Sequence, residues 1–409
     1  MRPLLTFSLF GSAFFYWMGW AMMRPSVALF IGSMGFPSYT IGFILALPAV
    51  LPFIFAMPIG RLIDRIGVRK SCWIGIVLLF AAAALYLLSF YSHRASFVAA
   101  AQLVLGLGSL FSWGALQVSA ALTGNRMNEK ERNHLMSRFS FATSLGQLTG
   151  PAVGGFLADA GGFARVFLVF VILLGCVGVF LFLLPNETFV RREDGDSEKG
   201  LRIFRSYAHG VNLLRWNPIF ALAILLNGLL FILIDLRMTF FPLYLAERQF
   251  SHTDIGILLS IAGLATLAIR PAVGFILNVM ESVRLSLICL LIGAGCLISL
   301  WFKPGYFALV VTVVFWAFST GVNQPLSMIM VAKSVGAQQQ GLGMSLRSMS
   351  NRTAEFINPA LFGIVSAAFG FSAGFGVVGL LLIVLSGSIA IRRYCNSVDS
   401  LHRQSHVGP

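Results

Sequence analysis

Charged side chains are scarce in this chain. Asp, Glu, Lys and Arg together make up 11% of its 409 residues, whereas apolar residues make up 57% and the mean hydropathy is +0.85. A water-soluble globular protein of this length needs a more polar surface than these residues can supply. The composition therefore excludes a soluble protein and predicts a chain that lies in a lipid bilayer.

The sequence also lacks the usual marks of catalysis. It contains no P-loop, no HExxH motif, no nucleophile elbow and no histidine cluster, and its loops are too short for a nucleotide-binding domain. Its five cysteines are scattered, mostly within apolar runs, which indicates small core residues rather than metal or disulfide chemistry. We therefore expect no enzyme activity, no cofactor and no metal site, and transport driven by an ion gradient.

Long apolar runs, by contrast, recur along almost the whole sequence. Twelve stretches of roughly 20 residues are each long enough to cross about 30 Å of hydrocarbon as a helix. We predict membrane spans at 4–31, 40–61, 71–91, 96–121, 135–158, 163–184, 218–243, 253–277, 284–302, 306–331, 342–367 and 372–392. The first run has no basic region beyond Arg2 and no small-residue cleavage site, so we interpret it as a retained span and not as a signal peptide.

A long polar stretch, roughly 185–217, separates the sixth and seventh predicted spans. We interpret it as a linker between an N-terminal half at 1–184 and a C-terminal half at 218–393, with a tail at 394–409. In the second part of the linker, apolar residues at helical spacing among arginines predict an amphipathic helix at the membrane interface.

The distribution of basic residues predicts the topology. The chain has 29 Lys and Arg against 15 acids, a formal net charge of +14. Basic residues concentrate in the termini, the linker and alternate loops that would share one side, and those of the other loops are Arg94, Arg165, Arg248 and Lys303. By the positive-inside rule, both termini and the linker are expected in the cytoplasm, and the multi-pass chain in the cell (inner) membrane. We expect no nucleic-acid partner.

The two halves share a weak internal repeat. A shift of 214 residues superposes Phe36, Ile41, Gly42 and Gly60 on Phe250, Ile255, Gly256 and Gly274. A shift of 208 residues superposes Met136, Ser137 and Pro151 on Met344, Ser345 and Pro359. Each shift pairs the same ordinal span of the two halves, which predicts duplication. Such repeats are typical of transporters, whose substrate site lies at the repeat interface near mid-membrane.

The loop after the second predicted span has a distinctive pattern. It reads GRLIDRIGVRK from Gly60 to Lys70, in which glycines allow a tight turn and basic residues suit a cytoplasmic loop. This loop resembles the signature loop of the major facilitator superfamily, which has an all-α fold of twelve membrane helices in two pseudo-symmetric six-helix bundles. The resemblance implies a charge-relay latch to the eleventh span; a purely topological role is the alternative. The gating residues that it implies are Gly60, Asp64, Arg65, Gly67 and Arg69.

The fifth predicted span carries a second pattern, GQLTGPAVGG from Gly146 to Gly155. Small residues four apart let helices approach closely, and Pro151 can kink the helix, so we assign Gly150 and Pro151 to gating. The span resembles the G-x-x-x-G-P-x-x-G-G element of the superfamily's drug/proton antiporter-like exporters, which implies efflux. A plain packing motif in a symporter is the alternative.

The second half departs from both patterns. Asn278 occupies the position that corresponds to Asp64, and Asn358 the position that corresponds to Gly150. In the fourth span, Gln102 precedes Gly106 where proton antiporters of this superfamily usually carry an arginine. The family's usual first-half proton relay is therefore not carried over.

Charged residues inside predicted spans are candidates for function, because they are costly in a bilayer. The acids well inside are Asp235 and Glu355, and the arginines are Arg24, Arg237, Arg270, Arg347 and Arg352. Arg270 and Arg347 lie near the cytoplasmic ends of their spans, where snorkelling or gate pairing is expected. Because a carboxyl group at low dielectric can be neutral in one state and ionised in another, we predict that Glu355 or Asp235 exchanges the proton. The alternative for Glu355 is a structural ion pair with Arg352, three residues away.

The excess of buried arginines over acids predicts an anionic or zwitterionic solute, held by Arg24 and either Arg237 or Arg352. Tyr16, Trp20 and Arg24 recur every four residues, as an aromatic cavity wall or as an interfacial belt. The further predicted cavity-wall residues are Trp113, Gln117, Asp235, Asn323 and Gln324.

We therefore predict proton-coupled export of a small organic solute, such as a carboxylate-bearing metabolite or a metal-chelating opine. A broad-specificity multidrug exporter is the main alternative, and a nutrient importer is a weaker one. A membrane enzyme, a lipid flippase and a sensor are weaker alternatives. An enzyme would need a catalytic constellation and a sensor a soluble output domain, and we find neither in the sequence. The expected partners are the solute, protons and the lipid bilayer, and the expected state is a monomer.

Overall fold

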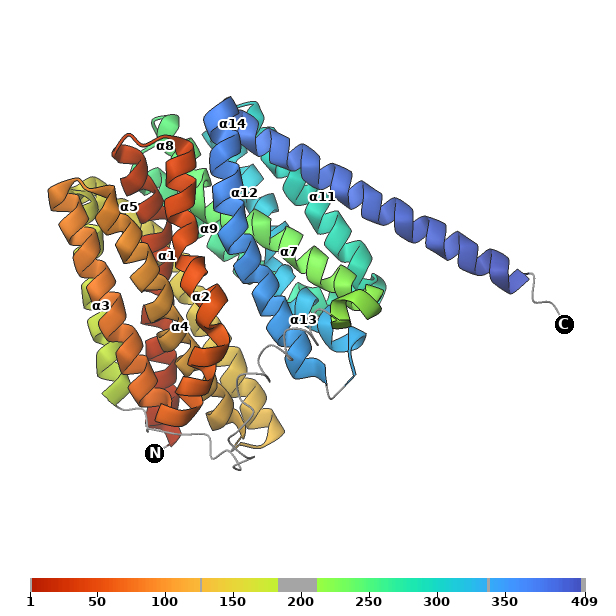
Figure 1. Cartoon of the computed structure of the whole chain (residues 1–409), viewed down its shortest axis with the longest axis horizontal. Helices are drawn as coiled ribbons and strands as arrows, with labels where there is room; N and C mark the ends of the chain where they lie inside the picture. The colour runs from red at the N-terminus through yellow and green to blue at the C-terminus, as the bar shows by residue number, and fades with distance from the viewer. Residues whose placement is uncertain (1, 126, 183–211, 337–338, 406–409) are drawn as a thin grey trace.

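The chain folds into packed helices (Figure 1). The computed structural model describes residues 2–125, 127–182, 212–336 and 339–405, so most of the predicted linker, with its interfacial helix, lies outside the described residues. The helices are α1 (Arg2–Ser33), α2 (Ser38–Ile66), α3 (Val68–Ser92), α4 (Ala95–Asn125), α5 (Glu129–Phe182), α7 (Pro218–Thr239), α8 (Phe241–Glu247), α9 (His252–Ile269), α10 (Ala272–Val279), α11 (Ser282–Trp301), α12 (Tyr306–Gly321), α13 (Asn323–Ser334) and α14 (Gln340–Ser405). The first part of the predicted tail thus continues α14.

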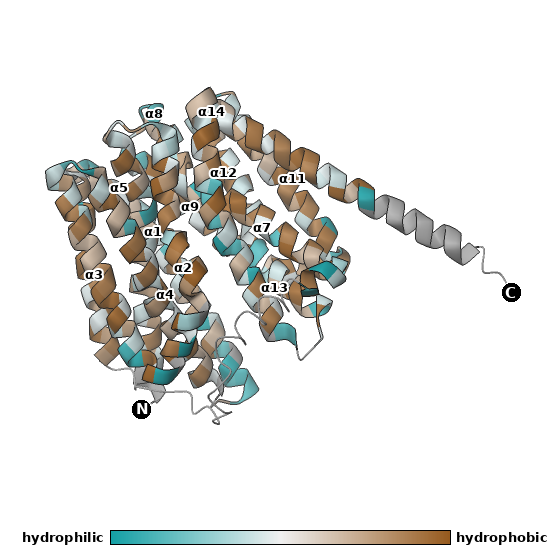
Figure 2. Ribbon diagram, viewed as in Figure 1, coloured by the Kyte–Doolittle hydropathy of each residue, from teal (hydrophilic) through white to brown (hydrophobic). Residues whose placement is uncertain are grey.

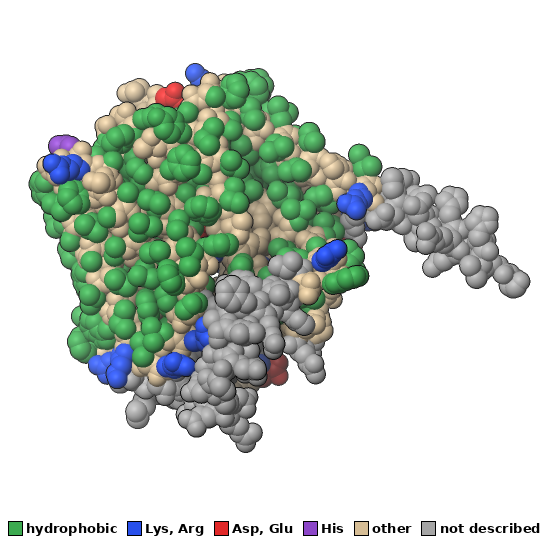
Figure 3. Space-filling model, in the orientation of Figure 1, with side chains coloured by type: hydrophobic (Ala, Val, Ile, Leu, Met, Phe, Trp, Pro, Cys, Tyr) green, Lys and Arg blue, Asp and Glu red, His purple; other side chains and the backbone are tan. Residues whose placement is uncertain are grey.

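Nine stretches of the described chain are long and apolar enough to span a membrane. Two of them contain a break: α5 leaves helical geometry at Gly161 and Gly162, and α14 does so at Gly370. Gly162 and Gly370 have φ values of 75° and 78°, which side chains rarely tolerate. Apolar residues line most helices (Figure 2) and cover most of the visible surface (Figure 3). The predicted all-helical membrane protein is confirmed.

The helices form two groups, α1–α5 and α7–α14, here called the first and second group (Figure 1). They contact each other mainly where α2 crosses α14 and where α5 crosses α9. Both crossings lie at one end of the molecule, and the groups diverge toward the end that carries the N-terminus (Figure 1). The space-filling view shows the surface hollowed between the two groups (Figure 3).

The two crossings are built alike from glycine and proline. A Cβ atom on Gly42 would overlap the carbonyl oxygen of Pro359, and one on Gly256 would overlap that of Pro151. Gly42 and Gly256 are the pair related by the shift of 214 residues, and Pro151 and Pro359 are related by the shift of 208. The two crossings are therefore equivalent contacts, so the sequence repeat has a structural counterpart.

The glycines of the fifth-span pattern have distinct partners. Cβ atoms on Gly146 and Gly150 would meet α1 backbone, and a Cβ atom on Gly155 would overlap the carbonyl oxygen of His252 at the start of α9. Gly146 and Gly150 therefore lie on the face of α5 that packs on α1, and Gly155 lies on the face that packs on the second group. This close approach is the packing that the spacing predicts.

A carboxylate strengthens the crossing of α5 and α9. Asp159 accepts hydrogen bonds from the backbone N–H of His252 (3.1 Å) and Thr253 (2.7 Å) and from the Thr253 hydroxyl (2.6 Å), and it lies 2.7 Å from His252 Nδ1. It thereby satisfies free N–H groups at the start of α9. At the equivalent crossing, α2 begins after Pro37 with no side-chain cap, so the two crossings differ in polar support.

Within the signature loop, Gly67 alone separates α2 from α3. Gly67 ends α2 and precedes α3 with φ 89°, which explains the glycine there. A Cβ atom on Gly60 would have nothing within 4 Å. Arg65 is exposed and Arg69 half-buried, while the Asp64 side chain lies outside the described residues. The latch to the eleventh span stays a prediction.

Adding a methyl group at either crossing should separate the groups. We expect Gly42→Ala and Gly155→Ala each to cost about 1–3 kcal/mol of stability, because carbonyl oxygens occupy the added volume. Thermal unfolding of the detergent-solubilised protein measures the effect. Gly274→Ala is the matched control, because nothing lies within 4 Å of its Cβ position. Equal melting temperatures for all three variants would contradict this account of the crossings.

Candidate functional site

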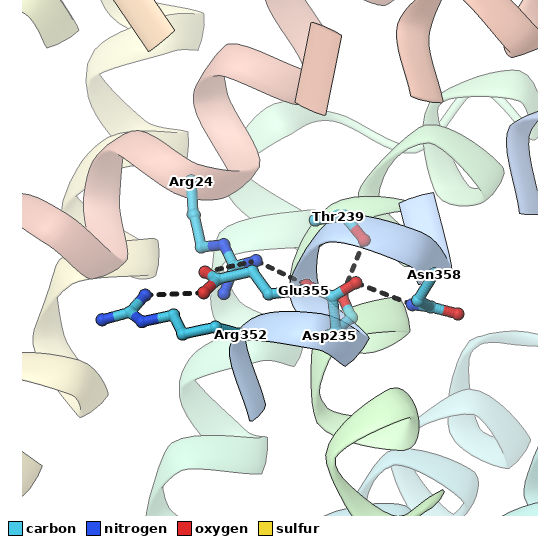
Figure 4. A network of polar contacts seen from close by, with 6 residues as sticks. All are labelled: Arg24, Asp235, Thr239, Arg352, Glu355 and Asn358. Carbon is cyan, nitrogen blue, oxygen red and sulfur yellow. Dashed lines mark hydrogen bonds and ion pairs between the residues drawn. The ribbon is translucent and has the colours of Figure 1, made fainter. Parts of the chain in front are cut away.

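Arg24 of α1 reaches from the first group to two carboxylates of the second (Figure 4). Its Nη2 lies 2.5 Å from Asp235 Oδ1 on α7 and 3.3 Å from Glu355 Oε1 on α14. The Arg24 side chain is 19% exposed, and those of Asp235 and Glu355 are 0% and 7% exposed. One guanidinium therefore connects three helices of both groups in a largely buried position.

The same carboxylates have further partners on α14. Asn358 Nδ2 donates to Asp235 Oδ2 over 2.7 Å, and Arg352 Nη1 lies 2.7 Å from Glu355 Oε2. Arg352, Glu355 and Asn358 follow one another at intervals of three, so α14 presents them on neighbouring turns of one face. Thr239 donates to the backbone carbonyl of Asp235 over 2.7 Å. The predicted pairing of Arg352 with Glu355 is present.

The four charged residues Arg24, Asp235, Arg352 and Glu355, together with Asn358, are here called the charge network. With both acids ionised, its two guanidinium groups and two carboxylates cancel. Protonating either acid would leave positive charge without full compensation, which is costly in a buried place. The network is therefore sensitive to the loss of a single negative charge, as a proton-exchanging site requires.

An aromatic cluster lies on the first-group side. Tyr16 stacks on Trp20 and on Trp113 of α4, with centroid distances of 6.3 and 5.6 Å, and Trp113 stacks on Phe139 of α5 at 5.7 Å. Tyr16 and Trp20 precede Arg24 on α1 at intervals of four residues. The predicted strip of Tyr16, Trp20 and Arg24 therefore leads toward the charge network. Sequence reasoning missed Phe139, because a lone Phe in an apolar helix carries no signal.

The remaining predicted substrate residues lie apart from the network. Arg237 is buried and donates to Thr320 Oγ1 of α12 over 3.0 Å, within the second group. Gln117 is exposed on α4, and Gln324 is exposed on α13. Asn323 is buried, and its Oδ1 has no partner among the described residues. Of the three arginines predicted to hold the solute, the structure brings together Arg24 and Arg352.

Gln102, at the position where a family arginine was expected, is buried and structural. Its Oε1 accepts a hydrogen bond from the Tyr86 hydroxyl over 2.9 Å. Gly106, one turn later, packs against the backbone of Pro48. The first group thus uses this position for packing between α3 and α4.

Removing Arg24 should destabilise the protein more when position 235 is Asp than when it is Asn. We expect Arg24→Gln to cost about 3–5 kcal/mol, because it leaves buried carboxylates short of a cation. Adding Asp235→Asn to Arg24→Gln should recover part of that loss. Thermal unfolding of the two single variants and the double variant forms the cycle that measures the coupling. Strictly additive effects would show that the two side chains do not interact.

Comparisons with known proteins agree over nearly the whole chain. The family description "Major Facilitator Superfamily" matches residues 9–305 and 238–395. "Multidrug resistance protein 2" of Bacillus subtilis (strain 168) is 22% identical over 362 residues, 87% of each chain. A POT family transporter in complex with 5-aminolevulinic acid has the same fold, with a TM-score of 0.78 and 16% identity over 95% of this chain and 96% of that one. A nucleoside transporter has a TM-score of 0.78 at 12% identity over 95% and 99% of the two chains.

These matches identify a transporter, not an enzyme. The family match covers both helix groups, and the two solved structures named above are transporters. The chain belongs to the Major Facilitator Superfamily.

Proposed function

We propose that the chain is a monomeric secondary active transporter with twelve spans in two six-helix bundles, 1–184 and 218–393. The nine candidate stretches support this number, because the breaks in α5 and α14 divide two of them and α1 adds a further apolar helix of 32 residues. The termini and the linker lie on the cytoplasmic side of the cell membrane, as the basic loops predict. The structure then represents a state open to the cytoplasm and closed at the two crossings.

The charge network couples transport to protons in this proposal. Its link between Arg24 and the second group is the observation that carries the proposal, because neutralising an acid weakens a contact between the groups. Glu355 contacts two guanidinium groups, whereas Asp235 contacts one. Neutralising Asp235 therefore sacrifices fewer ion pairs, which makes Asp235 the better proton carrier of the two.

The solute is a small organic anion or zwitterion, such as a carboxylate-bearing metabolite or a metallophore. Its carboxylate would replace Asp235 as the partner of Arg24 once Asp235 is protonated. The aromatic cluster of Tyr16, Trp20 and Trp113 would contact the apolar part of the solute. Export is supported by the fifth-span pattern and by the name of the Bacillus subtilis relative, which describes multidrug resistance.

Import is a second candidate, and the network gives the reason. A solute carboxylate and ionised Asp235 compete for Arg24, so protonation of Asp235 assists binding of the anion. Such linkage tends to move proton and anion in the same direction, as in a symporter. Broad multidrug export is a third candidate, which the aromatic cluster and the name of the curated relative favour.

The direction of coupling has a direct test. We first expect carboxylates or zwitterions, not lipophilic cations such as ethidium, to raise the melting temperature. The stabilising solute is then added outside proteoliposomes that contain pyranine. Antiport makes the lumen more alkaline as solute enters, and symport makes it more acidic. Stabilisation by ethidium without competition from any carboxylate would refute the anionic solute.

Asp235→Asn should abolish the pyranine response while solute-driven counterflow persists, because proton exchange is lost but binding is retained. Glu355→Gln should reduce the response less, because we assign the proton to Asp235. Glu129→Gln is the control, since Glu129 is an exposed acid at the start of α5. Coupling that survives in both Asp235→Asn and Glu355→Gln would show that neither acid carries the proton.

A further inference from the structure

Two arginines outside the charge network meet the same face of α13. Arg270, just after α9, donates from Nη1 to Ser144 Oγ of α5 (2.5 Å) and from Nη2 to Gln324 Oε1 (3.5 Å). Arg347 of α14 donates from Nη1 to Ser327 Oγ (3.3 Å). Gln324 and Ser327 are three residues apart, so they are neighbours on one face of α13. The two guanidinium groups therefore lie beside the same two turns of helix.

Neither guanidinium is neutralised by a described residue. The side-chain partners of Arg270 and Arg347 are hydroxyl and amide groups, whereas Arg24 and Arg352 pair with carboxylates. The Nε atoms of Arg270 and Arg347 are buried and have no partner within the described chain. Two nearby cations that keep unused N–H donors away from bulk water are stabilised by a bound anion.

The contacts of Arg270 argue against the expected snorkelling. A snorkelling arginine extends to the membrane surface, but Arg270 contacts Ser144 of the first group and Gln324 of the second. It therefore lies between the groups. The contact that Arg270 makes across the two groups is with the Ser144 hydroxyl, which supplies no negative charge.

We propose that Arg270 and Arg347 form a carboxylate-binding subsite for the transported solute. This inference rests on the proposed function, because it assigns the solute's negative group a first place to bind. Arg347 precedes Glu355 by eight residues in α14, which is about 12 Å along a helix. The subsite is displaced from the charge network toward the start of α14, the side on which the groups diverge.

The two sites then act in order. An anion that enters between the diverging groups meets Arg270 and Arg347 first, because the subsite lies nearer the end at which the groups diverge. No described acid neutralises these two arginines. It reaches Arg24 when Asp235 has been protonated. Binding at the subsite does not require that proton, so its affinity should be nearly constant across the pH range in which coupling changes.

Succinate is the probe, and succinamide is its uncharged analogue. Calorimetry on the purified full chain, at matched ionic strength, should show saturable binding of succinate and much weaker binding of succinamide. We expect Arg270→Gln and Arg347→Gln each to weaken the affinity for succinate about tenfold or more. Arg270→Lys, which keeps the charge, should retain most of the affinity. Lys333→Gln is the control, because Lys333 is exposed on the opposite side of α13.

The outcomes separate this inference from the proposed function. Equal binding of succinate and succinamide by the unaltered chain, or unchanged succinate binding in both glutamine variants, would overturn the subsite. Loss of succinate binding in Lys333→Gln to the same degree would also overturn it. A chain that binds succinate through these arginines but shows no pyranine response would refute proton coupling and leave the subsite standing.

Discussion

A guanidinium held by carboxylates of the opposite helix group ties the charge state of this protein to its conformation. Arg24 belongs to the first group, while Asp235 and Glu355 belong to the second. In a medium of low dielectric, none of the three can lose its partner without a large cost in free energy. The groups can therefore separate at this level only when something else compensates the charges. In the proposed mechanism, a proton on the acid and a carboxylate from the solute are the two species that do so.

The two crossings between the groups are built differently from this charged interaction. At the two crossings, α2 with α14 and α5 with α9, the closest contacts are between uncharged backbone atoms of glycine and proline. The two crossings thus have similar backbone geometry and can serve as pivots. Asp159 breaks their equivalence, because it caps α9 from the first group while α2 has no matching cap. Separation at the α5 and α9 crossing therefore has to break polar contacts that the other crossing does not have.

The sequence predicted the membrane, the helices and the internal repeat, because each depends on local pattern. Run length and glycine spacing are properties of neighbouring residues. The sequence also selected Arg24, Asp235 and Glu355, since a charge within an apolar span is conspicuous. It offered the local pair of Arg352 and Glu355, which lie three residues apart. It could not predict that Arg24 meets Asp235, because these two residues lie 211 residues apart. Arg237 has the same local signal as Arg24, yet it faces Thr320 inside the second group. The contact of Arg270 with α13 could not be predicted either. The sequence places Arg270 near the end of a span, but it does not show which helix lies beside that end.

The balance of charge between the groups bears on what can be carried. The network uses two arginines to cancel two acids, and Arg237, Arg270 and Arg347 are left with uncharged side-chain partners among the described residues. A cationic solute would add to this excess, and it would have to displace a guanidinium to reach either acid. An anion meets the opposite situation, because Arg270 and Arg347 carry positive charge that no described carboxylate compensates. In the proposed mechanism, a proton therefore accompanies or precedes the anion at the network. When Asp235 is neutral, the positive charge of Arg24 can bind the carboxylate of the solute.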